Sequence, residues 1–430
     1  GRIFMMKRYL ILLAVLSLSF SCACNKKAQE QTPELASVEL LPAELIKFTD
    51  HNNDFAFRLY AKADEEGKNL FFSPYSISTA LSMAYGGAKN NTATEMAKAL
   101  SFELPEALHH SAFKDLGNRL NELGKRGKAE LNVANGLFGA KLYEHLLVPE
   151  YKTLLQDFYG SDLYSLDFDD AQGSAKYIND WVLDRTNQRI KDLVSPDHIK
   201  QSNHGIVLVN AIFFKGKWLL QFDPKATKRE SFFTKPDRAA ENTKPVDLMY
   251  RQGKYGYARM PGCQVLELPY EEADLSMLMV LPDEQSADKT EMTPEAYKQW
   301  RGAIKPQEVK AIIPRFTLEL TLENVPRMMK SMGMIDAFSD VAADFTGIRK
   351  PGSADLYIMD IIHKAFVEVK EEGTEAAAAT AVVMATKSVP VFEDEIPVFR
   401  ADHPFYYMII HKPSGAVLFL GKFAVPPELD

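Results

Sequence analysis

The second half of this 430-residue chain is dominated by short apolar runs. Several are almost continuous in Val, Ile, Leu, Phe and Met, which is typical of strands that are covered on both faces of a sheet. The runs are GIVLVNAIFF (205–214), QVLELPY (264–270), LSMLMVLP (275–282), VKAIIPRFTLEL (309–320), AFVEVKEE (365–372), PFYYMIIH (404–411) and AVLFLGKFAV (416–425). So many buried strands require large sheets with cover on both sides.

The first half of the chain shows helical periodicity instead. Residues 52–63 and 76–83 carry apolar side chains at helical spacing, and the second stretch follows Ser73-Pro74, which is a helix-start signal. Helices first and strands later predict an α+β fold in which helices cover large sheets. No long linker and no fixed-period repeat divides residues 45–430, so we expect a single domain there.

The N-terminal residues predict an export signal. Lys7 and Arg8 precede the apolar run YLILLAVLSLSF (9–20), which is too short to span a bilayer comfortably and is followed by small residues. We interpret residues 1–23 as this signal with some upstream residues, in a bacterial type of arrangement. The polar residues 24–44 then form a tether. The protein is expected to be exported, either to the cell envelope or to the medium.

The cysteines at the end of the predicted signal bear on whether the protein is a lipoprotein or a secreted protein. In a lipoprotein, a cysteine at the end of the signal is acylated, and either Cys24 or Cys22 could take that role. The residues before them match the lipoprotein pattern loosely, so plain secretion remains the alternative. We expect membrane contact only through such an anchor. Cys263 is then the one thiol left in the body of the chain, so stability must come from a large core and not from disulfides.

Charge and motifs argue against several functional classes. The formal net charge of −8 does not suit a general nucleic-acid binder. The common hydrolase, zinc-protease, phosphate-loop and dinucleotide motifs do not occur, so we expect no enzyme, no cofactor and no metal. His109 and His110 are interpreted as a solvated pair, because neighbours on a helix point to different faces. Lys125, Arg126 and Lys128 are interpreted as a solvated loop.

Residues 371–388, EEGTEAAAATAVVMATKS, combine helix formers with strand formers. The alanine run alone would favour a surface helix. When the segment is written as a strand, one face carries mostly small, uncharged side chains. These are Thr374, Ala376, Ala378, Thr380, Val382 and Met384. Such a segment is compatible with a loop in one state and with a strand inserted between two others in another state.

Several separated blocks resemble the serpin family, in the order in which the family has them. EEGTEAAAATAVVMA (371–385) is similar to the inhibitory hinge and reactive-centre loop, and FRADHPFYYMI (399–409) is similar to the signature after that loop. The other similar blocks are NLFFSPYSISTALSMAYGGA (69–88), LVNAIFFKGKW (208–218), LPDE (281–284), IIPRF (312–316) and LFLGKF (418–423). The resemblance implies the serpin fold, α+β with three β-sheets, eight or nine helices and an exposed reactive-centre loop at about residues 371–398.

This resemblance implies a suicide-substrate inhibitor of a serine or cysteine endopeptidase. The protease would cleave the loop as a substrate, and the loop would insert into the central sheet as a strand, trapping the acyl-enzyme as a covalent 1:1 complex. Small hinge side chains keep insertion fast. The hinge residues are Glu371, Glu372, Gly373, Thr374, Glu375, Ala376, Ala377, Ala378, Ala379 and Thr380. The inhibitor is expected to be a monomer; a non-inhibitory carrier serpin is the alternative.

The usual loop length, counted from Gly373, places the scissile bond at Lys387-Ser388. A lysine at this position would fit trypsin-like or lysine-specific proteases, which have an acidic specificity pocket. Other registers remain open at this stage. A shift by one residue would expose Thr386, and cleavage after Met384 would suit elastase-like enzymes.

The resemblance also assigns residues that control the opening of the central sheet. The shutter, a hydrogen-bonded group beneath the sheet where strands must part, corresponds to Ser73, Ser76, Asn210 and His363. The breach is the point of first insertion, and Trp218 resembles its tryptophan. Arg315 and Glu371 resemble an ion pair at the same point.

Overall fold

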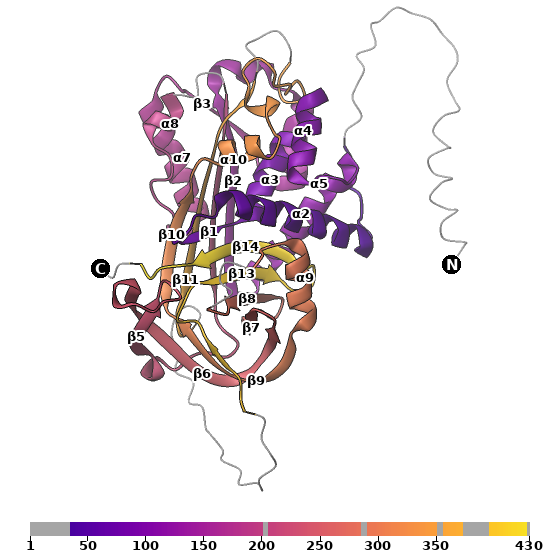
Figure 1. Cartoon of the computed structure of the whole chain (residues 1–430). Helices are drawn as coiled ribbons and strands as arrows, with labels where there is room; N and C mark the ends of the chain where they lie inside the picture. Colours follow the sequence, from indigo (N-terminus) through magenta and orange to yellow (C-terminus); the bar gives the residue numbers. More distant parts are fainter. Residues whose placement is uncertain (1–34, 201–204, 285–289, 351–355, 373–394, 428–430) are drawn as a thin grey trace, which may run out of the picture. The chain divides into compact units, whose positions relative to one another are not determined.

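Two hydrogen-bonded sheets account for the apolar runs. The computed structural model describes residues 35–200, 205–284, 290–350, 356–372 and 395–427, and all statements of structure refer to these (Figure 1). The smaller sheet, called the central sheet below, has the strand order β10-β11-β4-β2-β3. Its strands are β2 (Ala129–Ala140), β3 (Leu163–Leu166), β4 (Ile206–Gly216), β10 (Phe316–Leu322) and β11 (Ile358–Val369). The pairs β11–β4 and β2–β3 are parallel, and the others are antiparallel.

The larger sheet has nine strands in the order β1-β14-β13-β8-β7-β6-β9-β12, with β5 paired to β6. Its strands are β1 (Leu70–Phe72), β5 (Lys228–Phe233), β6 (Thr243–Met260), β7 (Cys263–Pro269), β8 (Leu275–Pro282), β9 (Lys305–Pro314), β12 (Val398–Arg400), β13 (Phe405–His411) and β14 (Ala416–Phe423). The family resemblance predicts three sheets where the described residues form two. The reason is β6, which pairs with β5, β9 and β7 along its eighteen residues and so joins all of these strands.

Nine α-helices lie in the described part of the chain. They are α2 (Pro42–Ala63), α3 (Pro74–Tyr85), α4 (Asn90–Leu100), α5 (Glu106–Lys125), α6 (Pro149–Tyr159), α7 (Ala171–Arg185), α8 (Pro196–Lys200), α9 (Pro294–Ala303) and α10 (Val325–Ser331). Ser73 caps α3 because its hydroxyl accepts a hydrogen bond from the backbone N–H of Ser76. Among these described helices, none is both long and apolar enough to cross a membrane.

Strand β4 has cover on both faces, as its apolar sequence predicts. Alternate residues of a strand point to opposite sides. Val207 and Val209 belong to an apolar cluster that they share with α7, whereas Ile212 and Phe214 belong to the large cluster between the two sheets. Strand β4 is therefore packed between α7 on one side and the nine-stranded sheet on the other.

The prediction that His109 and His110 are solvated is wrong, because both histidines are buried. Their rings do point in different directions, but each direction is covered by another helix. His109 Nε2 lies 2.7 Å from the hydroxyl oxygen of Ser82 in α3, and His110 Nδ1 lies 2.5 Å from that of Tyr159 in α6. Burial lowers the pKa of both, to about 3 for His110. No group of three metal-binding side chains occurs among the described residues.

We expect the protein to lose stability as the pH falls from about 6.5 towards 4. The pKa of His110 is about 3 in the folded protein, whereas a histidine in an unfolded chain titrates near 6.5, so the unfolded state binds more protons in this window. His110 alone should cost about 1.4 kcal/mol of unfolding free energy per pH unit. Urea unfolding at several pH values should show a flatter dependence for His110→Gln. The exposed His145 provides the control His145→Gln, which should keep the wild-type slope.

Candidate functional site

The parallel pair β4–β11 forms a seam in the central sheet. It is paired from Ile206 opposite Ile358 to Phe214 opposite Val367, and the other edge of β11 is occupied by β10. The chain leaves β11 after Val369 and leads directly into the alanine-rich segment. A segment that folds back at this point runs antiparallel to β11, and therefore also antiparallel to β4. The seam thus has the geometry that an inserted strand requires, with a correctly oriented neighbour on each side.

The four predicted shutter residues lie together at the middle of this seam, and all four are fully buried. His363 of β11 is the direct register partner of Asn210 of β4, and its Nδ1 contacts Asn210 Oδ1. The backbone N–H of Ser73 donates to His363 Nε2 at 3.0 Å, so Nδ1 carries the proton and donates it to Asn210. Burial lowers the pKa of His363 to about 3, which keeps the ring neutral as this arrangement requires.

The shutter also contains two groups that sequence reasoning did not identify. Asn135 of β2 is the register partner of Asn210 on its other side, and its Oδ1 accepts from the amide of Asn210 and from the hydroxyl of Ser76. The hydroxyl of Ser73 donates to the carbonyl oxygen of Leu418 in β14 at 2.6 Å. An asparagine inside the apolar strand sequence LNVANGLF was a visible signal for Asn135. The carbonyl of Leu418 gave none, because every residue has one.

Trp218 closes the end of the seam where the chain leaves β11. Its indole Nε1 donates to the carbonyl oxygen of Lys370 at 2.8 Å, and its backbone N–H donates to the carbonyl oxygen of Glu372 at 3.1 Å. The ring stacks on Tyr270, with centroids 4.5 Å apart and planes 11° apart. The predicted breach tryptophan therefore holds the last described residues before the alanine-rich segment.

Glu371 is buried at the same end, and Arg315 lies beside it as predicted. Arg315 Nη1 is 3.5 Å from Glu371 Oε1, and the hydroxyl of Thr227 donates to that oxygen at 2.7 Å. Arg315 also pairs with Asp247, which in turn pairs with Arg229. Because Arg315 is half exposed, its pair with Glu371 contributes little by itself. The neutral donor Thr227, which the sequence did not suggest, satisfies the buried carboxylate more directly.

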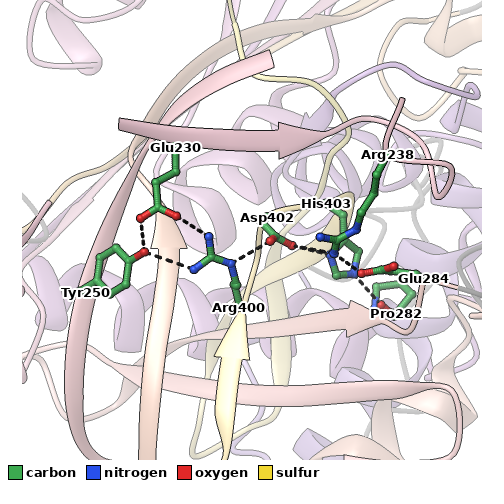
Figure 2. A network of polar contacts seen from close by, with 8 residues as sticks. All are labelled: Glu230, Arg238, Tyr250, Pro282, Glu284, Arg400, Asp402 and His403. Carbon is green, nitrogen blue, oxygen red and sulfur yellow. Dashed lines mark hydrogen bonds and ion pairs between the residues drawn. The ribbon is translucent and has the colours of Figure 1, made fainter. Parts of the chain in front are cut away.

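A polar network fixes the chain on the downstream side of the loop (Figure 2). Strand β12 is three residues long and pairs only with β9 at the edge of the larger sheet. Its Arg400 contacts Glu230 of β5 and donates from Nε to Asp402 at 2.8 Å. Burial alone would raise the pKa of Asp402, but hydrogen bonds from His403 and Arg400 lower it. The imidazole of His403 also contacts the carbonyl oxygen of Pro282 at 2.8 Å.

Several predicted residues lie outside the described part of the chain. They are Cys22 and Cys24, the hinge positions from Gly373 to Thr380, and Met384, Thr386, Lys387 and Ser388. Of the predicted hinge, Glu371 and Glu372 are described, and both are held at the breach. The site that can be built from contacts therefore consists of the seam, the shutter, the breach and the downstream network.

We expect Asn210→Ala to destabilise the native protein by about 1–3 kcal/mol, because it leaves the buried Nδ1–H of His363 without an acceptor and removes the amide that donates to Ser76 and Asn135. The midpoint of urea unfolding would measure this loss. Asn132→Ala on the neighbouring strand β2 is the matched control, since the amide nitrogen of Asn132 has no hydrogen-bond partner among the described residues. Equal midpoints for the two variants would show that the shutter contributes no stability.

Comparison with known proteins identifies the family. The family model described as "Serpin (serine protease inhibitor)" matches residues 50–426. Serpin B8 of Homo sapiens is 39% identical over 385 residues, covering 87% of this chain and 98% of that protein. The leukocyte elastase inhibitor of Bos taurus is 40% identical over 389 residues, with the same coverage of both chains.

Solved serpin structures have the same fold. Human thyroxine-binding globulin, in a complex with its hormone, has a TM-score of 0.77 at 29% identity and covers 90% of this chain and 100% of its own. Tengpin, a thermophilic serpin in its native state, has a TM-score of 0.77 at 25% identity, with coverage of 91% and 96%. The predicted serpin fold is confirmed. Because the family model spans most of the sequence and the relatives match over nearly their whole length, the chain belongs to the serpin family of serine protease inhibitors.

Proposed function

We propose that this serpin is a suicide-substrate inhibitor that traps an endopeptidase as a covalent 1:1 acyl-enzyme. The observation that carries this proposal is the parallel β4–β11 seam, which ends where the small-residue hinge begins. Attack by the protease nucleophile on the scissile carbonyl breaks the peptide bond, frees the amino end of the downstream peptide and leaves the upstream peptide esterified to the enzyme. Entry of that upstream peptide into the seam then carries the esterified protease along the sheet before water can complete hydrolysis.

Hydrogen bonding supplies much of the driving force in this proposal. Opening the seam breaks one ladder between β4 and β11, and the inserted strand makes two, one with each neighbour. A strand of about a dozen residues therefore gains a net of about ten backbone hydrogen bonds, each contributing about 1 kcal/mol. Burial of the alanine and valine side chains adds to this gain. The contact between His363 and Asn210 must break before the strand can pass the middle of the seam, so in this proposal the shutter adds to the barrier to insertion.

The breach contacts support a role in starting the insertion. Trp218 and Phe222 donate backbone hydrogen bonds to the carbonyls of Glu372 and Glu371, which hold the upstream end of the loop at the mouth of the seam. Small hinge residues follow immediately in the sequence. In this proposal the breach orients the hinge towards the seam, and the side chain of Arg315 steadies Glu371 while the loop is intact.

The target class follows from the scissile position. With the bond at Lys387-Ser388, the lysine ammonium would enter an acidic specificity pocket of a trypsin-like or lysine-specific protease. The second candidate is an elastase-like target with cleavage after Met384. It is favoured by the similarity to leukocyte elastase inhibitors, whose name states their target. The two candidates differ in the peptide that cleavage releases.

We expect the full chain, mixed with trypsin at near-equimolar ratio, to give a complex that survives a denaturing gel. Sequencing of the released peptide should start at Ser388 if Lys387 is the cleaved residue. Trypsin with its active-site serine blocked is the control and should give no complex. Neutrophil elastase in place of trypsin tests the shifted register. Clean cleavage by both enzymes with no complex would contradict inhibition and favour the carrier alternative.

We expect Ala378→Asp to turn the inhibitor towards a substrate. Position 378 lies on the hinge face that an inserted strand would bury, so a carboxylate there slows insertion while hydrolysis continues. The number of inhibitor molecules consumed per inactivated protease should rise by about tenfold, a change of about 1.4 kcal/mol between the two competing barriers. Ala377→Asp makes the same chemical change on the opposite face and should have a smaller effect. Equal effects would contradict the assignment of faces.

The place of action is proposed from the N-terminal residues. A basic start, a short apolar run and a cysteine support export, with lipid attached to Cys24 or Cys22. An inhibitor tethered by residues 24–44 would protect the surface that carries it. Cell fractionation combined with labelling by a radioactive fatty acid tests this. Mature protein in the cytosol would overturn export, and unlabelled protein in the medium would replace the anchor with plain secretion.

A further inference from the structure

A cavity of about 500 Å³ lies where the end of α2 meets strands β1 and β10 and helix α10. Its wall combines residues near position 65 with residues near position 325, so the cavity exists only in the folded chain. The volume falls within the range of small-molecule pockets, about 300–1,000 Å³. The described lining contains no residue of the seam, the shutter, the breach or the downstream network, so this cavity is separate from the site described above.

The apolar part of the cavity lining is aliphatic. Ala63, Leu70 and Leu322 are buried, and Met328 is half buried. None of the described lining residues is aromatic, so a flat ring system would find no ring to stack on. The lining instead suits the carbon atoms of a compact, saturated ligand.

The charged side chains of the lining are only partly paired. Lys68 pairs with Glu65. Lys62 and Arg327 are exposed and form no ion pair within the described part of the chain, and the same holds for Glu323. The cavity is therefore left with two free cations and one free carboxylate. A guanidinium binds a carboxylate through two parallel hydrogen bonds, so this balance favours a ligand with a single carboxylate.

Glu323 and Asn324 supply hydrogen-bonding groups to the same cavity. Asn324 precedes α10, but its side chain makes no capping hydrogen bond to that helix. A carboxylate accepts hydrogen bonds from hydroxyl groups, and an amide both donates and accepts them. A ligand with several hydroxyl groups would therefore satisfy both side chains without adding charge.

We propose that this cavity binds a sugar acid. Lys62 and Arg327 hold its carboxylate, whereas Glu323 and Asn324 bind its hydroxyl groups. The ring carbons pack on the aliphatic lining. Such a ligand is either a free sugar acid or the acidic end of a glycan chain. Binding here does not depend on the proposed protease inhibition.

Calorimetric titration of the full chain with galacturonate tests the site. Galactose has the same ring without the carboxylate, and cyclohexanecarboxylate has a six-membered ring and the carboxylate without the hydroxyl groups. Galacturonate should bind about tenfold more tightly than either, as expected for charge-assisted hydrogen bonds. Affinity equal to that of galactose would overturn the carboxylate contact. Affinity equal to that of cyclohexanecarboxylate would overturn the hydroxyl contacts.

The two cations are tested by substitution. Lys62→Gln and Arg327→Gln should each weaken galacturonate binding by about threefold, and the double variant by about tenfold, as for solvent-screened ion pairs. Lys330→Gln is the matched control, since Lys330 is in the same helix α10 but outside the lining, with its ammonium 5.4 Å from the Phe338 ring centroid. Galactose binding should stay the same in all variants. Equal galacturonate affinity in the double variant and the control would overturn the site.

Glu323→Gln separates a sugar acid from other small anions. The change removes a negative charge, so it should strengthen the binding of cyclohexanecarboxylate by about threefold. It also replaces a strong acceptor for hydroxyl groups by a weaker one, so the advantage of galacturonate over cyclohexanecarboxylate should shrink. An equal gain for both ligands would show that Glu323 only repels anions and would overturn its hydroxyl contact.

An acidic disaccharide with one carboxylate, galacturonosyl-rhamnose, distinguishes the two sources of the ligand. Tighter binding of the disaccharide than of galacturonate supports the end of a glycan chain, and weaker binding supports a free sugar acid. Failure of both to bind overturns the proposal. None of these titrations uses a protease, so they remain valid if the trypsin experiment fails.

Discussion

The contact between His363 and Asn210 holds together the two strands on which the rest of the structure depends. It is a side-chain bond across a parallel pair, added to the backbone ladder at the same register position. Both side chains are fully buried, so neither can exchange its partner for water while the seam is closed. Ser73 and Ser76 tie the pair to α3, and Asn135 ties it to β2. Opening the seam therefore disturbs one helix and three strands at once, which makes it a cooperative step.

This arrangement explains how a protein can be stable and still reserve room for another strand. The backbone ladder of β4 and β11 runs from Ile206 to Phe214 of β4 with one register shift, between Ile358 and Asp360 of β11, so the closed seam already pairs the backbones of the two strands. An inserted strand would be equally satisfied, with two ladders in place of one. The two states differ in the hydrogen bonds and apolar area of a single segment. In the proposed mechanism the shutter would act as a kinetic element, since its hydrogen bonds are present before opening and would be broken on the way.

Much of the fold followed from local sequence patterns. The continuous apolar runs predicted strands with cover on both faces, and β4 packs against a different cluster on each side. Local patterns could not show that β6 joins strands expected in separate sheets, because that depends on which strands pair along its length. Local patterns also gave the wrong exposure for His109 and His110. The helix was predicted, but its burial is decided by α3 and α6, which are distant in sequence. Thr227 and Leu418 were missed for the same reason.

The two ends of the loop are held in unequal ways, and this gives the molecule a direction. On the upstream side, Glu371 and Glu372 are held mainly by single hydrogen bonds from Trp218, Phe222 and Thr227. On the downstream side, Arg400 and a buried Asp402 are joined by charged pairs to β5 and to one another. A cut between these ends leaves one side that can peel away one bond at a time and another that stays with the larger sheet. If the loop is cut as proposed, this asymmetry would decide in advance which half of the severed chain moves and which stays in place.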